Sequence, residues 1–134
     1  MADDATGGCL CGAVRYRASG EALARTLCHC ASCRRATGGV SVAWAVFPKD
    51  AVTFTGEVSE YSSSPGIFWR SCARCGSLVG YRRDTRPDHT DITTATLDDP
   101  GAFPPTVEIW TGERIAWEQL NPALPHKLRS TLNE

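Results

Sequence analysis

The segment Cys72-Ala73-Arg74-Cys75-Gly76 lies between two runs that are typical of strands, residues 67–71 and residues 78–82. Two cysteines three positions apart on one tight turn can direct both sulfurs at the same ion, whereas they are awkward partners for a disulfide. The glycine behind the second cysteine permits a left-handed backbone that turns amide groups toward sulfur. The spacing therefore predicts a zinc knuckle at the tip of a β-hairpin.

A second, tighter cysteine turn, Cys9-Leu10-Cys11-Gly12, can complete a tetrahedral site of four thiolates with this knuckle. Such a site has no open coordination position and serves structure. It would close a loop of about 60 residues and so tie the N-terminal strand to the middle of the chain. Metal binding of this kind can contribute roughly 10 kcal/mol or more to folding. We expect one structural zinc, held by Cys9, Cys11, Cys72 and Cys75.

The remaining cysteines belong to one short segment, Cys28-His29-Cys30-Ala31-Ser32-Cys33. Three protein ligands leave the fourth position of a tetrahedral zinc free, which distinguishes a catalytic zinc from a structural one. Three thiolates weaken the metal as a Lewis acid toward water but suit it to bind an external thiol. We expect Cys28, Cys30 and Cys33 to hold a catalytic zinc. Two alternatives stay open: a second structural zinc completed by His29, His126 or another side chain, and redox-active or inert thiols.

Arg34 and Arg35 directly follow this triplet. Their charges would stabilise thiolates, and their guanidinium groups suit a carboxylate of an anionic ligand, so both are candidate ligand-binding residues. The alternative is that they form a solvated helix face. His29 lies between two metal ligands, so we expect its side chain to point away from their metal.

Length and charge limit the functions that the chain can have. The chain has 134 residues and a mass of 14.5 kDa, which predicts one domain, and its net charge of −1 indicates no nucleic-acid or membrane partner. Its longest mostly apolar stretch, residues 40–47, is far too short to span a membrane. Residues 1–4 are acidic rather than apolar, so we expect no secretory signal and a cytoplasmic location. An odd number of cysteines in a reducing compartment favours metal over disulfides.

Short strand-like runs separated by Gly and Pro turns dominate the rest of the sequence, which predicts a mainly β fold with one or two small antiparallel sheets. One short helix is expected at residues 31–37, ended by Gly38-Gly39, and a second helical turn at residues 117–120. We expect most of the four tryptophans to pack in the core, with some free to line a pocket over the open zinc. The expected strands are residues 13–18, 40–47, 51–54, 67–71, 78–82, 91–97 and 106–110.

The three cysteine motifs in this order, followed by Leu97-Asp98-Asp99-Pro100, resemble the glutathione-dependent formaldehyde-activating enzyme family, which includes the centromere protein V domain. The resemblance covers about residues 7–120 as a single domain and leaves residues 121–134 as a C-terminal tail. It implies a β-tent fold of small antiparallel sheets bridged by a structural zinc. It also implies that the four outer cysteines hold this zinc and that Cys28, Cys30 and Cys33 hold a catalytic one.

The family resemblance implies a carbon–sulfur lyase that reversibly adds formaldehyde to glutathione to give S-(hydroxymethyl)glutathione. Its partners would be a small-molecule thiol and an aldehyde. Many members carry a histidine in the strand where this chain has Glu108-Ile109-Trp110, so the exact substrate stays open. Two other classes remain: a non-enzymatic β-tent module with two structural zincs, and a redox enzyme like the methionine sulfoxide reductases of similar fold. The clustering of three central cysteines disfavours the last, which needs a free thiol of low pKa.

Overall fold

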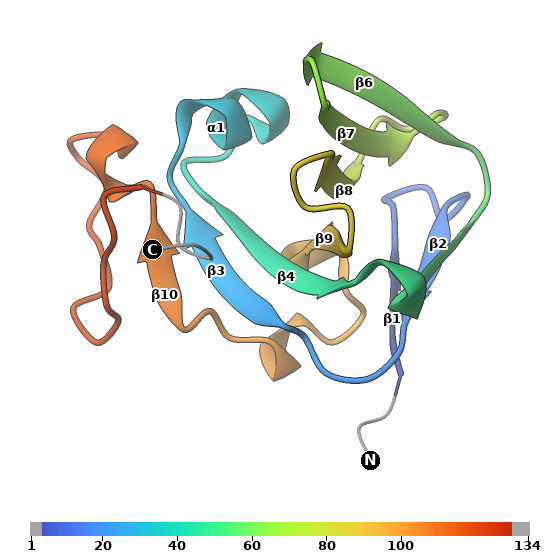
Figure 1. Cartoon of the computed structure of the whole chain (residues 1–134), viewed down its shortest axis with the longest axis horizontal. Helices are drawn as coiled ribbons and strands as arrows, with labels where there is room; N and C mark the ends of the chain where they lie inside the picture. The colour runs from blue at the N-terminus through green and yellow to red at the C-terminus, as the bar shows by residue number, and fades with distance from the viewer. Residues whose placement is uncertain (1–3, 130–134) are drawn as a thin grey trace.

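The computed structural model describes residues 4–129, which form ten strands, one α-helix and four short 3-10 turns (Figure 1). The helix α1 covers Ala31–Thr37, as the sequence predicts. Cys30 is its N-cap, and the N–H of Gly38, in the left-handed region, donates to the carbonyl of Arg34 at 2.7 Å. The strands are β1 (Ala5–Gly8), β2 (Arg15–Ala18), β3 (Ala24–Cys28), β4 (Val42–Pro48), β5 (Val52–Thr55), β6 (Val58–Ser64), β7 (Ile67–Cys72), β8 (Leu78–Arg83), β9 (His89–Thr93) and β10 (Val107–Ile109).

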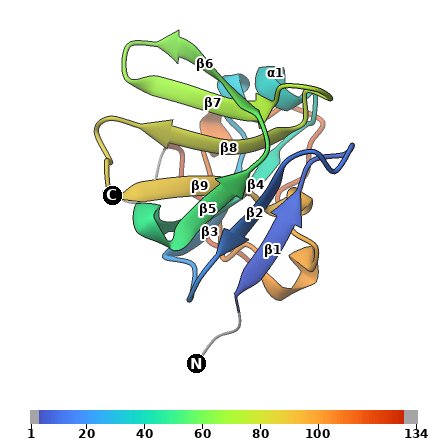
Figure 2. The same ribbon diagram turned by 90° about the vertical axis from the view of Figure 1, so that its right-hand side faces the viewer.

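The strands form two sheets, so the expectation of a mainly β fold is confirmed. Strands β1, β2 and β5 make a small antiparallel sheet, which lies in front of part of the larger sheet in Figure 2. The larger sheet has the order β10-β3-β4-β9-β8-β7-β6 and is antiparallel except for the parallel pair β10 and β3.

Alternation along the strands gives the larger sheet two different faces. One face presents Ala45, Phe47 and Ile92 to the small sheet, where they form a core with Tyr16 and Ala18. The opposite face carries the residues one position away, and its buried cluster contains two of the central cysteines and two tryptophans. The larger sheet therefore has a structural core on one face and the central cysteines on the other.

Three strands were not expected from the sequence, because their residues carry little apolar alternation. Strand β1 contains two glycines, β3 reads Ala-Arg-Thr-Leu-Cys, and β6 is mostly exposed serine. Each forms because a neighbouring strand supplies the partner hydrogen bonds. Tertiary pairing outweighs weak propensity here.

Two local expectations were wrong. Strand β9 ends at Thr93, and Thr94–Thr96 forms a 3-10 turn in which the Thr96 hydroxyl donates to the carbonyl of Thr93 at 2.8 Å. Residues 117–120 form no helix. The guanidinium of Arg114 instead donates to the carbonyls of that loop, and Trp117 is 68% exposed.

The described part of the C-terminal tail, residues 121–129, runs beside β10. The N–H of Glu108 donates to the carbonyl of Pro125 at 3.0 Å, and the N–H of Lys127 donates to the carbonyl of Glu108 at 2.9 Å. The segment therefore covers an edge that would otherwise be open to pairing. Residues 130–134 of the expected tail lie outside the described residues.

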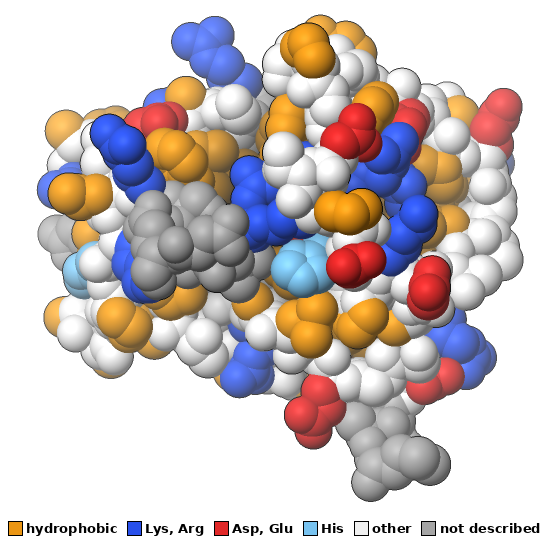
Figure 3. Space-filling view, viewed as in Figure 1, with side chains coloured by type: hydrophobic (Ala, Val, Ile, Leu, Met, Phe, Trp, Pro, Cys, Tyr) orange, Lys and Arg blue, Asp and Glu red, His pale blue; other side chains and the backbone are white. Residues whose placement is uncertain are grey.

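No helix among residues 4–129 is both long and apolar enough to cross a bilayer. On the face drawn in Figure 3, acidic and basic side chains are interspersed. The surface on that side therefore lacks a broad field of one sign.

Candidate functional site

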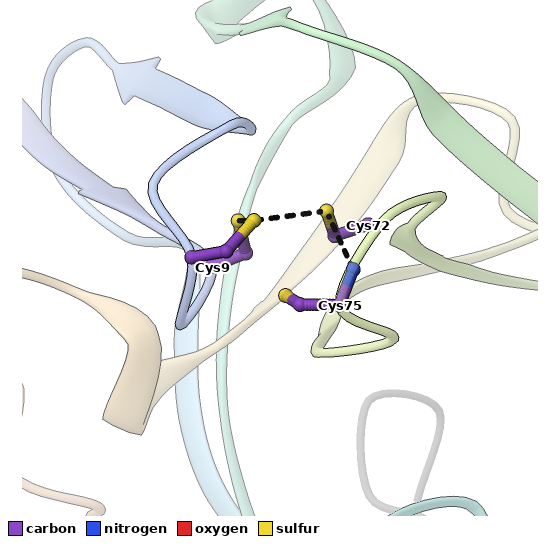
Figure 4. A group of neighbouring side chains, drawn as sticks. Cys9, Cys72 and Cys75 are labelled. Atoms are coloured by element: carbon purple, nitrogen blue, oxygen red, sulfur yellow. Dashed lines mark hydrogen bonds between the residues drawn. The ribbon is translucent and has the colours of Figure 1, made fainter.

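The structure brings the four outer cysteines together in a first cluster, at the junction of the two sheets. Each of their Sγ atoms lies within 4.8 Å of the others. Cys9 and Cys11 come from the turn between β1 and β2, Cys72 ends β7, and Cys75 lies in the turn between β7 and β8. Figure 4 shows Cys9, Cys72 and Cys75 pointing toward one another from these separate turns. The four sulfurs fit one tetrahedral zinc.

Both turns direct backbone N–H groups at sulfur. The N–H of Val14 donates to Cys9 Sγ at 3.2 Å, and the N–H groups of Arg74 and Cys75 donate to Cys72 Sγ at 3.3 and 3.4 Å. Gly12 and Gly76 have φ angles of 82° and 80°, which close the two turns where a side chain would be strained. This arrangement stabilises thiolates, the form that binds zinc.

Ser77 connects the two turns. Its hydroxyl lies 3.2 Å from Cys75 Sγ and accepts a hydrogen bond from the N–H of Leu10 at 3.0 Å. Hydrogen bonds from Ser77, its hydroxyl first, lower the pKa of the Cys75 thiol to about 5. This shift favours the thiolate form of Cys75, the form that binds zinc.

The second cluster consists of Cys28, Cys30 and Cys33, whose Sγ atoms also lie within 4.8 Å of one another. Cys28 ends β3, Cys30 caps α1, and Cys33 lies in the first turn of that helix. The Sγ atoms of Cys28 and Cys33 are 3.5 Å apart, and the N–H of Cys33 donates to Cys30 Sγ at 3.3 Å. The junction between β3 and α1 thus brings three sulfurs close to one point.

The thiols of this second cluster share protons unevenly. Hydrogen bonds from Cys28, and then from Cys33, lower the pKa of Cys30 to about 3, whereas the same contact raises the pKa of Cys28. Three sulfurs this close together favour binding of one soft cation, which would replace all three protons. The donor set fits zinc with three protein ligands.

A cavity of about 310 Å³ opens over the second cluster, and all three of its cysteines line it. Ser63 and Ser64 at the end of β6, and Ile67 at the start of β7, also line it. In Figure 1, α1 and the β6–β7 hairpin both lie at the top of the view, above β4. The first cluster does not line this cavity, so the two sets of cysteines have different access to small molecules.

Aromatic rings form one side of the cavity. The ring centroid of Tyr81 lies 5.7 Å from that of Trp44 and 4.8 Å from that of Trp69. Trp44 Nε1 donates to Cys33 Sγ at 3.4 Å, so the aromatic wall contacts the sulfur cluster directly. Trp110, the one described non-glycine residue with a positive φ, also lines the cavity, whereas exposed Trp117 does not.

The comparison with family models decides where this chain belongs. The model of the glutathione-dependent formaldehyde-activating enzyme matches residues 4–113, which include both cysteine clusters. The chain belongs to the glutathione-dependent formaldehyde-activating enzyme family.

Comparison with curated proteins found no match. Among solved structures, the chain is similar to the crystal structure of a Rhodobacter sphaeroides protein, with 23% sequence identity and a TM-score of 0.58. The similarity covers 69% of this chain and 87% of the other. At this identity the likeness shows a shared fold.

Arg34 and Arg35 of this family member do not line the cavity. Arg34 is half-buried and donates from Nη2 to the backbone carbonyl of Glu113 at 3.4 Å, and Arg35 is exposed on α1. Arg83 and Arg86 do line the cavity, and neither side chain forms a hydrogen bond or ion pair within residues 4–129. The role of Arg34 and Arg35 in ligand binding stays a prediction.

His29 points away from the sulfur cluster into the protein. It is fully buried, and its Nε2 lies 2.7 Å from Glu108 Oε1, which is itself 1% exposed. Glu108 Oε2 accepts from the N–H of Asn121 at 2.6 Å and lies 3.3 Å from His126 Nε2. The structure therefore places neither His29 nor His126 among the groups that could hold the metal. Strand β10 thus supplies, through Glu108, a carboxylate for His29.

Asp91 lies in the cavity wall, on β9. Burial raises the pKa of its carboxyl to about 7, although Arg83 and Arg86 oppose this shift. At neutral pH a large fraction of this carboxyl is therefore protonated, which leaves the positive charge of the two arginines available in the cavity.

Asp91→Asn is expected to change how stability depends on pH. Because the native carboxyl has its pKa near 7 rather than 3.8, the native state holds more protons than the unfolded state between these values. The free energy of unfolding of the wild type therefore falls as pH rises toward 7. Asn stays neutral at every pH. The difference in free energy of unfolding between the variant and the wild type should therefore grow in favour of the variant from pH 5.5 to 8.5, by on the order of 2 kcal/mol.

Urea unfolding of the zinc-loaded proteins at the two pH values measures this gap. Asp88→Asn, in the exposed turn before β9, is the matched control and should show no such widening. Parallel pH profiles for Asp91→Asn and the wild type would contradict the assignment.

Proposed function

We propose that the cavity over Cys28, Cys30 and Cys33 is a zinc-dependent carbon–sulfur lyase site that reversibly adds formaldehyde or a related aldehyde to glutathione or a similar thiol. One observation supports this most. The three clustered cysteines line a cavity, whereas the other four cysteines form a cluster that does not line it. Family membership supports the same chemistry.

Zinc on the three sulfurs would supply an open coordination position at which an incoming thiol loses its proton. The chain supplies the remaining functions. Trp44 fixes Cys33 through its hydrogen bond, and the walls of the cavity hold the aldehyde carbon close to the thiol sulfur, so that C–S bond formation becomes effectively intramolecular. In the reverse direction the same cavity receives the departing thiol.

We assign recognition of the anionic part of the thiol to Arg83 and Arg86. Both line the cavity, both are half-buried, and both lack a partner for hydrogen bonding within the described chain. Guanidinium groups bind carboxylates through paired hydrogen bonds. A thiol that carries carboxylates, as glutathione does, fits this charge.

Arg83→Gln and Arg86→Gln should each raise the KM for glutathione by about tenfold and change kcat by less than about threefold, because a charge-assisted hydrogen bond contributes roughly 1.5–3 kcal/mol to binding. Steady-state kinetics over a range of glutathione concentrations measures both constants. Arg17→Gln, on the small sheet outside the cavity, is the control. An increase in KM from Arg34→Gln or Arg35→Gln alone would assign this role to the helix arginines instead.

Exchange NMR tests the reaction itself, since it measures the formation and breakdown of S-(hydroxymethyl)glutathione at equilibrium against the spontaneous rate. Catalytic amounts of the zinc-loaded protein should accelerate exchange in both directions.

No acceleration, together with two zincs that glutathione does not disturb, would favour a non-enzymatic module with two structural zincs. One zinc together with titratable thiols would favour a redox enzyme. The proposed reaction needs reduced thiols, which agrees with a cytoplasmic location.

A further inference from the structure

Tyr81 places a phenol in the cavity wall beside the second cysteine cluster. Its ring packs between Trp44 and Trp69, with centroid distances of 5.7 and 4.8 Å. Trp44 Nε1 in turn donates a hydrogen bond to Cys33 Sγ. The ring therefore has a fixed position relative to the sulfurs.

The hydroxyl of Tyr81 forms no hydrogen bond within residues 4–129. The hydroxyl of Tyr16, by contrast, lies 2.7 Å from Thr96 Oγ1. Buried or half-buried tyrosine hydroxyls usually find a partner. In Tyr81 this donor stays available to a molecule in the cavity.

We propose that Tyr81 is a catalytic residue of the aldehyde-transfer reaction, donating a hydrogen bond to the aldehyde oxygen as negative charge develops there. The inference rests on the proposed function. In the forward direction a sulfur lone pair forms the C–S bond, and the π pair of the C=O bond moves to oxygen. That oxygen ends with the proton that the thiol lost, so the step needs no oxidant or reductant. In reverse, the oxygen loses this proton and the C–S bond breaks.

The surroundings keep Tyr81 in its donor form. Burial raises the pKa of the phenol most, and Arg83 opposes this shift without cancelling it. The hydroxyl thus carries its proton at neutral pH. A positioned donor to a developing oxyanion typically contributes a factor of about 100 to kcat.

Tyr81→Phe removes only the hydroxyl and keeps the ring that packs against both tryptophans. We expect kcat in the exchange assay to fall by about 100-fold. The KM for glutathione, the glutathione affinity from calorimetry and the content of two zincs per chain should stay unchanged. Tyr61→Phe, on exposed β6 outside the cavity, is the matched control and should match the wild type.

An unchanged kcat in Tyr81→Phe, in a protein whose wild type accelerates exchange, would overturn this role and leave the proposed function standing. Loss of zinc or of glutathione affinity together with kcat would also overturn it, because the hydroxyl would then support the site rather than the reacting oxygen. A wild type that fails to accelerate exchange would remove both proposals.

Discussion

Cys72→Ser is expected to leave the chain unfolded or insoluble. Cys72 is 2% exposed, ends β7 and contacts Cys11 from the other sheet at 3.8 Å between Sγ atoms. A structural zinc can contribute roughly 10 kcal/mol or more to folding, which is comparable to the whole stability of about 5–15 kcal/mol of a small domain. Because zinc on the four sulfurs would join the two sheets, loss of one ligand would weaken the connection between the β1–β2 turn and the β7–β8 turn.

Soluble yield, circular dichroism and zinc content after purification measure this effect. Titration of the wild type with a strong chelator should produce the same unfolding as its tighter zinc is removed. A Cys72→Ser protein that is folded and retains full activity would contradict the structural role of the first cluster.

Cys30→Ser is expected to abolish turnover while leaving a folded protein with one zinc in place of two. Cys30 is the N-cap of α1 and lines the cavity. Serine is a favourable N-cap, so the helix keeps its first turn, but a hydroxyl is a poor ligand for zinc beside two thiolates. Exchange should return to the spontaneous rate.

The same change of cysteine to serine at Cys30 and at Cys72 makes each variant the control for the other. Zinc counting, exchange NMR and thermal unfolding separate their effects. If Cys30→Ser lost both zincs, the two clusters would not be independent sites.

The sequence was sufficient to predict which cysteines come together. The ligands of each turn are neighbours along the chain, and the two distant turns were joined because together they supply the four ligands of a closed zinc site. It also predicted α1 to the residue, and Gly38 is a local signal for the C-terminal end of the helix. The pairing of β7 with β8 was predictable for the same reason, because a short turn connects them.

The walls of the cavity were not predictable in this way. Tyr81 and Asp91 are directly opposite one another on β8 and β9, and Asp91 is opposite Val46 on β4. Strands β8 and β9 are far from the cysteine triplet in sequence, so only sheet register places their side chains over it. The alternation of Tyr81 and Arg83 was the one available signal, but without the register it did not reveal which face would meet the sulfurs.

The pairing of His29 with Glu108 was similarly inaccessible, because it depends on the parallel pairing of β3 with β10. The sequence could predict that a residue between two ligands points away from the metal. The sequence could not predict that Glu108 supplies the carboxylate that contacts His29.

Titration of the cobalt-substituted protein with glutathione, followed by absorption, tests most directly whether an outside sulfur can join the cysteine triplet. We predict that glutathione changes the ligand-field bands of one cobalt and leaves the other unaltered, and that Cys30→Ser removes the responsive bands. Spectra that stay constant at saturating glutathione would show that both metals are already enclosed by the chain, and would contradict an open catalytic site.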